Sequence, residues 1–374
     1  MATSPTLNRI VLEPARRNAK VEEFERQLRG KIVGQDEAVS QMVNVYEMMV
    51  AGMTLPGRPI ANLLFLGPTG SGKTRIIEAA AEILFGSPKA FLKVDCGEFQ
   101  HSHEIAKLIG SPPGYIGHRE THAVLTQGAI DQFQTESLKL TFLLFDEVEK
   151  ASDALWQLLL GVLDKGSLTL GDNQRVDLSR TVLVMTSNLG AEAMSRVSTA
   201  GIGFRSGSLA PSAQQLSRRL DRIALNAARS HFSPEFMNRL DKVVVFSALD
   251  HAQLRQILDI ELAHVRERIH AMHQEQTFEL ECSPEAREFL IREGTDDKYG
   301  ARPLKRAIER HLVLPLARLL STAQVEAGDR VVVDMNQDRG ILAFSKHEPG
   351  ARQSSPEAQF TADEWECFAA LAFA

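Results

Sequence analysis

The chain has 374 residues, of which 44% are hydrophobic, and its 42 Lys and Arg against 48 Asp and Glu give a net charge of −6. This length exceeds one ordinary core and predicts two domains. The slightly acidic balance disfavours a polyanion-binding surface, so nucleic acid is not an expected partner. Three scattered cysteines and the lack of any long apolar run predict a cytoplasmic protein without membrane contact.

The N-terminal residues 1–30 form a charged lead-in that ends in a predicted helix, VEEFERQLRG, with Gly30 as its expected stop. Residues 31–247 alternate short apolar runs with segments of helical period, which is typical of a parallel α/β sheet. The expected strands are NLLFLG, AFLKVD, LTFLLFDE, RTVLVMTSN and KVVVF. We therefore predict a large α/β domain over this range.

Residues 248–346 predict a smaller, mainly helical domain. Its helical segments are AQLRQILDIELAHVRERI, SPEAREFLIREG and YGARPLKRAIERHLVLPLARLL, and a strand pair, DRVVVDM and GILAFSK, follows them. Residues 347–374 form a tail, for which we expect a loosely docked amphipathic end rather than a partner-binding segment.

A glycine-rich loop predicts nucleotide binding. Residues 67–74 match the GxxxxGK[ST] pattern, after a predicted strand and before the helix TRIIEAAAEILFG, which is expected to end at Gly86. Such a loop closes its backbone N–H groups around phosphates, while Lys73 supplies a cation and Thr74 a hydroxyl for Mg²⁺. The predicted ATP-binding residues are Gly67, Pro68, Thr69, Gly70, Ser71, Gly72, Lys73 and Thr74.

A second motif places two carboxylates at the end of a buried strand. The run FLLFDE ends in Asp146 and Glu147. Beside a phosphate loop, Asp146 can hold Mg²⁺ and Glu147 can orient and deprotonate the attacking water. Strands often end in acids, so the motif draws its meaning from its pairing with the phosphate loop.

Three further polar residues are candidates for the same site. Asn188 follows the strand RTVLVMTSN, Arg239 lies in FSPEFMNRLD, and Arg302 lies in YGARPL. A guanidinium suits the charge that develops on phosphate oxygens. From the residues alone, an Asn at this position is more often a turn residue, and each arginine is more often part of a surface ion pair.

Seven motifs in order carry a family resemblance, which covers about residues 26 to 346. They are KIVGQDEAV, GPTGSGKT, GSPPGYIG, FDEVEKA, SLTLGDNQRVDLSRTVLVMTSNLGA, FSPEFMNRLD and KYGARPLKRAIE. This succession resembles the AAA+ ATPases of the Clp unfoldase class, in particular the second ATPase module of the ClpA, ClpB and ClpC type. Only thirty residues precede KIVGQ, so we expect a stand-alone, single-ring form.

The resemblance implies a P-loop AAA+ parallel-sheet domain, followed by a smaller helical domain, and a role for each motif residue. Ile32 and Val33 would wall the adenine. Asp146 and Glu147 would be the Walker B pair, and Asn188 the first sensor. Arg239 would be a finger acting in the adjacent subunit of a homo-hexamer, and Arg302 the second sensor.

The segment GSPPGYIGHRE gains its meaning from the same resemblance, which places it on a loop that lines the central channel. Two prolines limit the freedom of the unfolded loop, and Gly114 and Gly117 let its tip move. Tyr115, followed by Ile116, is then an amphipathic grip for polypeptide. The alternative is a buried turn tyrosine.

The Gly- and Ser-rich stretch STAGIGFRSGSLAPSAQQ predicts a mobile surface loop. Its tripeptide Ile202, Gly203 and Phe204 resembles the segment with which Clp unfoldases dock onto a ClpP-type peptidase. The same residues are equally able to pack the loop onto its own subunit.

Three smaller features receive simple interpretations. GSLTLGDNQRVDL predicts a hairpin with its turn near residues 171–173, which in the family faces the pore. His101 and His103 lack further ligands at metal spacing and are expected to form a capping or loop pair. Trp156 is expected in the core.

The sequence therefore predicts an ATP-dependent unfoldase or chaperone that threads polypeptide through a hexameric pore and possibly feeds a peptidase. Two alternatives stay open. One is an AAA+ remodeller or assembly scaffold without processive unfolding, for which Tyr115→Ala would change little. The other is a nucleic-acid loader, which would require a basic face.

Overall fold

The computed structural model describes residues 13, 15–111, 123–200, 213–271, 277–296, 300–336 and 338–347. Two compact units make up the chain: the larger contains Met1–Glu261 and Leu290–Ile308, and the smaller contains Leu262–Phe289 and Glu309–Ala374. The predicted domain division after residue 247 stays a prediction.

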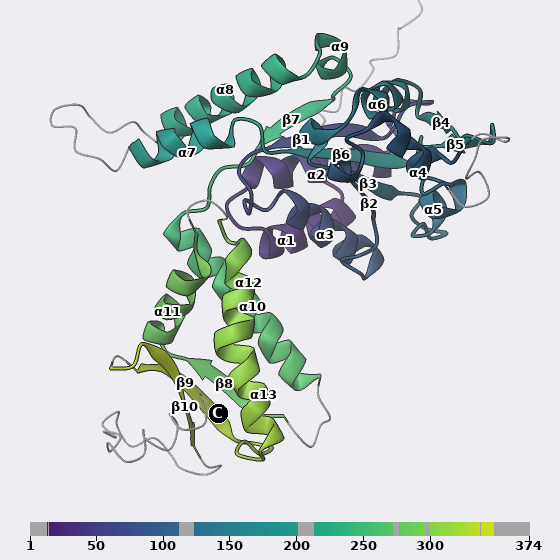
Figure 1. Cartoon of the computed structure of the whole chain (residues 1–374). Coiled ribbons are helices and arrows are strands. Elements are labelled where there is room, and N and C mark those ends of the chain that lie inside the picture. The colour runs from purple at the N-terminus through teal and green to yellow at the C-terminus, as the bar shows by residue number, and fades with distance from the viewer. Residues whose placement is uncertain are drawn as a thin grey trace, which may run out of the picture. The chain divides into compact units, whose positions relative to one another are not determined.

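A five-stranded parallel sheet organises the larger unit (Figure 1), and it confirms each predicted strand. Its order is β2-β3-β6-β1-β7, and neighbouring strands pair in parallel. The strands are β1 (Ala61–Leu66), β2 (Leu92–Asp95), β3 (Thr141–Asp146), β6 (Thr181–Ser187) and β7 (Lys242–Val245). All residues of β1 and β6 are buried, as expected for central strands of a sheet that is covered on both faces.

Alternate residues of each central strand face two different cores. In β1, Leu63 and Phe65 pack with the first core, while Leu64 and Leu66 pack with the second. The first core takes residues of α1 (Ala19–Lys31), α2 (Asp36–Val50) and α3 (Lys73–Phe85). The second takes residues of α6 (Asp153–Lys165) and α8 (Ala213–His231), so the helices cover both faces of the sheet (Figure 1).

The two predicted helix ends at glycines had different outcomes. α3 ends at Phe85, and Gly86 caps it in the left-handed conformation at φ +77°, as predicted. The predicted stop at Gly30 is wrong, because α1 continues to Lys31 and the Ile32 N–H donates to Leu28 O. Gly30 is accommodated within the helix, which ends one residue later.

Short elements connect the strands and helices of the larger unit. They are η1 (Cys96–Glu98), η2 (Ser102–Glu104), α4 (Ile105–Ile109), α5 (Gln127–Asp131), η3 (Val148–Lys150), α7 (Ala191–Ala200), α9 (Pro234–Met237) and α12 (Arg302–Ile308). His101 caps η2 together with Glu104, and its ring stacks on that of His103, which confirms a capping pair. Trp156 packs in part against the second core and touches Phe232 and Phe236.

The predicted hairpin is confirmed as the antiparallel pair β4 (Ser167–Thr169) and β5 (Arg175–Asp177). Its turn contains Asn173 at φ +68°. The Gly171 N–H donates to Ile109 O at 2.8 Å. The hairpin turn therefore rests on the C-terminal end of α4.

Gly171→Ala is expected to destabilise the larger unit because a Cβ at this position would lie 2.5 Å from Gly110 O and 2.9 Å from Ser111 C. Backbone atoms yield less readily than a flexible side chain, so we expect a loss of about 1–3 kcal/mol, measured by thermal or urea unfolding. Gly161→Ala in α6 is the matched control, since nothing lies within 4 Å of its Cβ position. Equal stability of the two variants would contradict the contact.

The smaller unit contains a three-stranded sheet in the order β10-β9-β8. The predicted strand pair is confirmed as β9 (Arg330–Asn336) and β10 (Ile341–His347), which pair antiparallel. A third strand, β8 (Glu279–Cys282), pairs parallel with β9 and was missed. Its burial alternates between exposed Glu279 and Glu281 and buried Leu280 and Cys282, but four residues give a weak periodic signal.

Three helices complete the predicted helical segments: α10 (His251–His270), α11 (Pro284–Gly294) and α13 (Leu314–Ser321). Just before α13, residues Glu309–Val313 form a π-helical turn. Pro315, in the first turn of α13, lacks an N–H and crowds the preceding turn, which accounts for the wider winding there.

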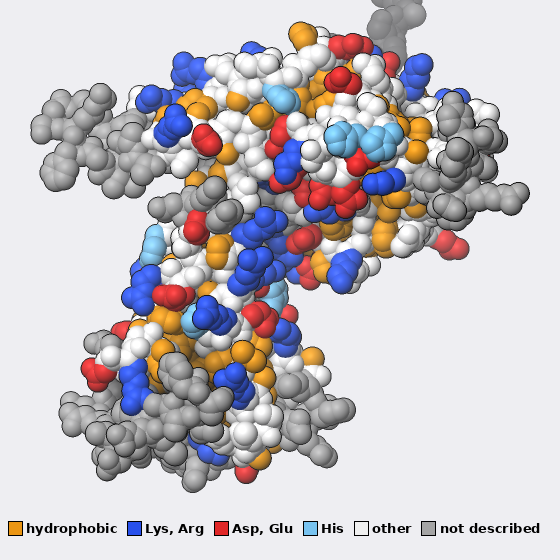
Figure 2. Space-filling model, in the orientation of Figure 1, with side chains coloured by type: hydrophobic (Ala, Val, Ile, Leu, Met, Phe, Trp, Pro, Cys, Tyr) orange, Lys and Arg blue, Asp and Glu red, His pale blue; other side chains and the backbone are white. Residues whose placement is uncertain are grey.

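Within the described ranges, none of the helices has the length and apolarity needed to cross a bilayer. On the visible face, Lys and Arg side chains lie among Asp and Glu side chains (Figure 2). The acidic and basic groups are thus interspersed there, in keeping with the small net charge.

Candidate functional site

A cavity of about 400 Å³ in the larger unit lies where the carboxyl ends of β1, β3 and β6 meet. This edge is the usual binding position of open parallel sheets. The cavity brings together twelve predicted site residues, namely Ile32, Val33, Thr69, Gly70, Ser71, Gly72, Lys73, Thr74, Asp146, Glu147, Asn188 and Arg302. Gly67 and Pro68 directly precede this set, whereas Arg239 is not among the lining residues.

The loop from Gly67 to Gly72 takes a conformation that only glycines accept readily. Gly67, Gly70 and Gly72 have φ of +146°, +78° and +102°. A Cβ at Gly67 would lie 2.4 Å from Phe246 O, so the loop also needs a glycine there for space. α3 begins directly after the loop at Lys73, so its free N–H groups lie at the cavity.

Lys73 is a buried cation at the centre of the site. Its Nζ donates to Gly67 O at 2.7 Å, Pro68 O at 2.9 Å and Asn188 Oδ1 at 2.8 Å. Burial lowers the pKa of Lys73 to about 8, against the opposing effect of the nearby carboxylates, of which Glu149 has the largest influence. Lys73 is therefore mainly protonated at pH 7.

Asp146 ends β3 and is held by two donors. Lys93 Nζ lies 2.6 Å from its Oδ2, and the Thr186 hydroxyl donates to its Oδ1. Burial raises the pKa of Asp146, but the hydrogen bonds from Lys93 and Thr186 outweigh it and hold the pKa below its usual value. The carboxylate is thus ionised and presents the hard oxygen that Mg²⁺ prefers.

Glu147 follows β3 in the left-handed conformation, at φ +56°. Its N–H donates to Thr186 Oγ1 at 3.1 Å, and its side chain pairs with Lys150. This backbone conformation is unfavourable for a residue with a side chain and is found preferentially at functional sites. Here it turns the carboxylate of Glu147 toward Asn188.

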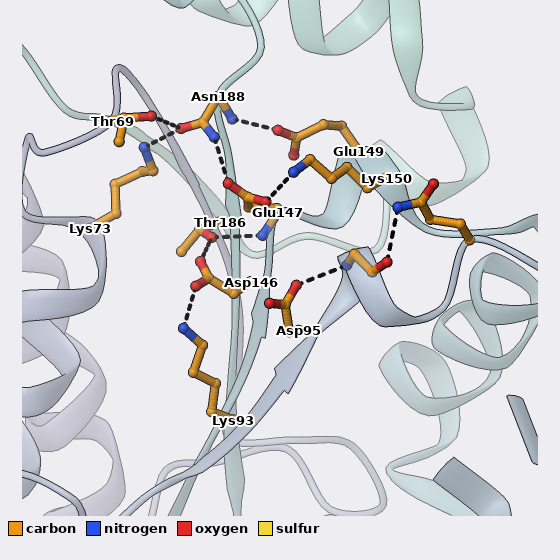
Figure 3. A network of polar contacts seen from close by, with 12 residues as sticks. Thr69, Lys73, Lys93, Asp95, Asp146, Glu147, Glu149, Lys150, Thr186 and Asn188 are labelled. Atoms are coloured by element: carbon orange, nitrogen blue, oxygen red, sulfur yellow. Dashed lines mark hydrogen bonds and ion pairs between the residues drawn. The ribbon is translucent and has the colours of Figure 1, made fainter. Parts of the chain in front are cut away.

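Asn188 connects the cation to the carboxylates (Figure 3). Its Oδ1 accepts from Lys73 Nζ, and its Nδ2 donates to Glu147 Oε1 at 3.3 Å. Its own backbone N–H donates to Glu149 Oε1 at 3.0 Å. A single amide therefore bridges the phosphate loop and the end of β3.

An apolar wall forms another side of the cavity. Ile32 is 9% exposed and Val33 is half-buried, and they share the lining with Leu249, Ile257 and Ile260. Arg302, at the start of α12, is exposed and lines the same cavity. These side chains surround a space suited to a flat apolar ring beside a charged group.

Arg239 lies elsewhere on the larger unit, between α9 and β7. Ser233 caps α9 by accepting from the Phe236 N–H at 3.2 Å. The Arg239 side chain donates to Leu160 O at 3.1 Å and pairs with Glu235 at 2.9 Å. Arg239 O accepts from Asn62 Nδ2 at 3.1 Å, so its backbone is tied to the sheet.

The residues of the cavity fit ATP and Mg²⁺. Nothing lies within 4 Å of the position that a Cβ of Gly72 would take. This leaves room for a phosphate beside the N-terminus of α3. Lys73 offers a buried positive charge, and Thr74 and Asp146 offer oxygen ligands. Anion-binding and cation-binding groups thus lie in one cavity, as a magnesium nucleotide requires.

Four polar residues around the site were not predicted from the sequence. They are Gln35, Lys93, Thr186 and Glu149. Gln35 is buried and donates from Nε2 to Ser71 O and Ser247 O, at 3.0 Å each. Lys93 and Thr186 lie on strands adjacent to β3, so the order of the sheet, once known, would have indicated them.

Three predicted segments lie outside the described residues. They are the loop with Gly114, Tyr115, Ile116 and Gly117, the tripeptide Ile202, Gly203 and Phe204, and residues 348–374 of the predicted tail. In the described ranges, no cluster of three or more His, Cys, Asp or Glu side chains is arranged to hold a metal ion.

Family comparisons identify both parts of the chain. Residues 58–243 match the AAA domain (Cdc48 subfamily), and residues 249–333 match the C-terminal, D2-small domain, of ClpB protein. The chain belongs to the Clp class of AAA+ ATPases. The parallel sheet, the phosphate loop and the order of the two parts all agree with this family.

Curated relatives of this Clp-class ATPase are chaperones and protease subunits. The chain is 35% identical over 325 residues to "Chaperone protein ClpB 1" of Thermosynechococcus vestitus, and 38% over 326 residues to "Chaperone protein ClpB" of Pseudomonas putida. It is 35% identical to the "ATP-dependent Clp protease ATP-binding subunit ClpA homolog" of Porphyra purpurea. These alignments cover 86%, 86% and 85% of the chain. The chain spans only 34–37% of the length of these relatives.

Solved structures of Hsp104 share the fold of this Clp-class ATPase. The Saccharomyces cerevisiae Hsp104:casein complex, in an extended conformation, matches 89% of this chain and 53% of its own, with TM-score 0.73 and 31% identity. A closed state of Hsp104 with ATPyS and FITC casein matches 87% of this chain and 52% of its own, with TM-score 0.69 and 31% identity.

Proposed function

We propose that this Clp-class ATPase hydrolyses ATP, with Mg²⁺, in the cavity and uses the energy to unfold polypeptide and thread it through a homo-hexameric pore. The observation that carries the catalytic part is the chain of contacts from Lys73 through Asn188 to Glu147, beside ionised Asp146. These contacts place the Lys73 cation, which faces the phosphates, in line with the Glu147 carboxylate, which can deprotonate the attacking water.

The chain's own residues supply the binding. Ile32 and Val33 pack against the adenine, and the backbone N–H groups of residues 67–74 cradle the phosphates. Lys73 neutralises phosphate charge from its buried position. Arg302 approaches the same phosphates from α12 and senses the bound nucleotide.

Residues at the start of α3 and at the ends of β3 and β6 supply the chemistry. Thr74 and Asp146 would hold Mg²⁺, which would neutralise charge on the transferred phosphoryl group. Glu147 accepts a proton from the attacking water, and Asn188 holds the Glu147 carboxylate in place. Lys93 and Thr186 keep Asp146 ionised and oriented.

The position of Arg239 supports the proposed assembly of several subunits into a ring. This guanidinium is absent from the cavity lining, and we propose that it completes the site of an adjacent subunit, as an arginine finger. Hydrolysis then depends on ring assembly. The polypeptide substrate class is supported by the similarity to Hsp104, whose solved structures contain casein.

We also propose that the protein works in the cytoplasm. Cys96 and Cys282 are buried free thiols, and burial raises the pKa of both. Protonated buried thiols are inert and suit a reducing compartment.

Tyr115→Ala tests whether Tyr115 grips the polypeptide substrate. Because Tyr115 is proposed to grip polypeptide and not to contact ATP, we expect the variant to keep ATPase activity within about twofold and to lose unfolding of a tagged fluorescent protein. Tyr115→Phe is the control, because it keeps the aromatic ring, and it should retain most unfolding. Tyr46→Ala does not serve as a control, because the Tyr46 ring packs on Phe24 and its loss would also affect folding. Full unfolding by Tyr115→Ala would contradict the gripping role.

A ClpP-type peptidase is proposed as a partner through Ile202, Gly203 and Phe204. The support is their position between Asn188 and Arg239, which matches the docking interval of Clp unfoldases. Phe204→Ala is expected to abolish capture by a cognate ClpP in a pull-down with ATP, because it removes the apolar anchor. ATPase activity serves as the folding control, and unchanged capture would rule the contact out.

A further inference from the structure

One carboxylate beside the cavity has no part in the proposed function. Glu149 lies in η3, and its Oε1 accepts from the Asn188 backbone N–H at 3.0 Å. Its Oε2 is buried and has no hydrogen-bond partner in the described part of the chain. A buried carboxylate oxygen without a donor is unfavourable for folding, so stability alone does not explain an acid at this position.

The contact with Glu149 fixes the backbone of Asn188, whose side chain bridges Lys73 and Glu147. Asn188 follows directly after β6, where the strand's own hydrogen bonds end. An N–H bonded to a carboxylate holds its peptide plane more firmly than one bonded to a neutral acceptor. The plane sets the direction in which the Asn188 side chain leaves the backbone, toward Lys73 Nζ at 2.8 Å and Glu147 Oε1 at 3.3 Å.

The same turn carries Glu147 and Glu149, two residues apart. Glu147 is bonded through its N–H to Thr186 on β6, and Glu149 is bonded to Asn188, also at the end of β6 (Figure 3). Besides the bond from Asn188 Nδ2 to Glu147 Oε1, two contacts therefore join the turn after β3 to the end of β6. Together they set how the Glu147 carboxylate and the Asn188 amide face each other.

We propose that Glu149 is a positioning residue for ATP hydrolysis, which acts by holding the Asn188 backbone so that its amide bridges Lys73 and Glu147. The inference rests on the proposed function, since Asn188 and Glu147 take their roles from it. Glu149 itself contacts neither the phosphates of ATP nor the attacking water.

Steady-state ATPase kinetics of three variants test the proposal. Glu149→Asp keeps the charge but shortens the side chain, and Glu149→Ala removes it. Both are expected to lower kcat about tenfold or more, with KM for ATP within about threefold. Glu149→Gln keeps an acceptor of the same reach but loses the charge, so its kcat should lie between that of the parent and that of Glu149→Ala. If Glu149→Asp and Glu149→Ala both remain within twofold, the proposal is overturned.

A double variant separates action through Asn188 from an independent effect. Because Glu149 acts through Asn188, Glu149→Asp combined with Asn188→Ala should be no slower than Asn188→Ala alone. Fully additive losses would overturn the proposal. Glu192→Gln is the matched control, since this glutamate side chain is 92% exposed in α7.

Amide hydrogen exchange of Asn188 gives a readout that needs no hydrolysis. In the absence of ATP, exchange at this N–H should be faster in Glu149→Asp than in the parent chain. Unchanged exchange would overturn the positioning role. If the chain bound but did not hydrolyse ATP while exchange responded as expected, the proposed function would fail and the contact would stand.

Discussion

Glu147→Gln should bind ATP and assemble like the parent chain yet hydrolyse ATP about 100-fold more slowly or worse. The amide keeps the shape of the side chain and can still meet Asn188, but it cannot accept the proton of the attacking water. The measurement pairs a steady-state ATPase assay with a nucleotide-binding titration. Affinity within about threefold of the parent is expected, because Glu147 makes no proposed contact in binding.

Glu192→Gln is a matched control for this variant, as it makes the same chemical change at an exposed position. It should leave both turnover and affinity unchanged. If Glu147→Gln hydrolysed ATP at the parental rate, another group would have to be the base. A parallel loss of binding and turnover would instead indicate that Glu147 supports the shape of the cavity.

Mixing two inactive variants should restore ATP hydrolysis. Lys73→Ala removes the phosphate cation but leaves Arg239, and Arg239→Ala does the reverse; each alone should lose about 100-fold or more in turnover. If Arg239 acts on a neighbouring site, a mixed ring contains interfaces with an intact cavity and an intact arginine. Random mixing in equal amounts should then recover up to about a quarter of parental activity.

Arg196→Ala is the control arginine for this experiment, since its side chain is 82% exposed. It should be fully active alone, and an equal mixture of it with either inactive variant should show about half of the parental activity. A mixture that shows only the summed residual rates would contradict action between subunits. If Arg239→Ala alone hydrolysed ATP at the parental rate, Arg239 would have no role in hydrolysis.

The strands of the larger unit were predictable because each carries a strong local signal. β1 and β6 each contain four consecutive apolar residues, at 63–66 and 182–185, and each is followed by a loop with distinctive polar residues. β8 was missed because its burial alternates over only four residues. The predicted stop at Gly30 was wrong because an exposed position within a helix accommodates a glycine at a cost of only about 1 kcal/mol.

The cavity residues from contiguous motifs were predictable, and their supporting partners were not. Lys73 and Asp146 belong to patterns whose spacing carries chemistry. Lys93 and Thr186 reach Asp146 from neighbouring strands, and that adjacency exists only once the order β2-β3-β6 has formed. Glu149 lies within the quoted motif FDEVEKA, but nothing local indicates that its partner is the backbone of Asn188.

We propose that ATP hydrolysis in this cavity drives the unfolding of polypeptide. The most direct measurement is the fluorescence of a tagged fluorescent protein incubated with the chain and ATP, with and without a ClpP-type peptidase. We predict a steady, ATP-dependent loss of fluorescence that disappears with a non-hydrolysable ATP analogue and in Glu147→Gln. Undiminished fluorescence while the chain hydrolyses ATP at its full rate would contradict the proposal that hydrolysis drives unfolding.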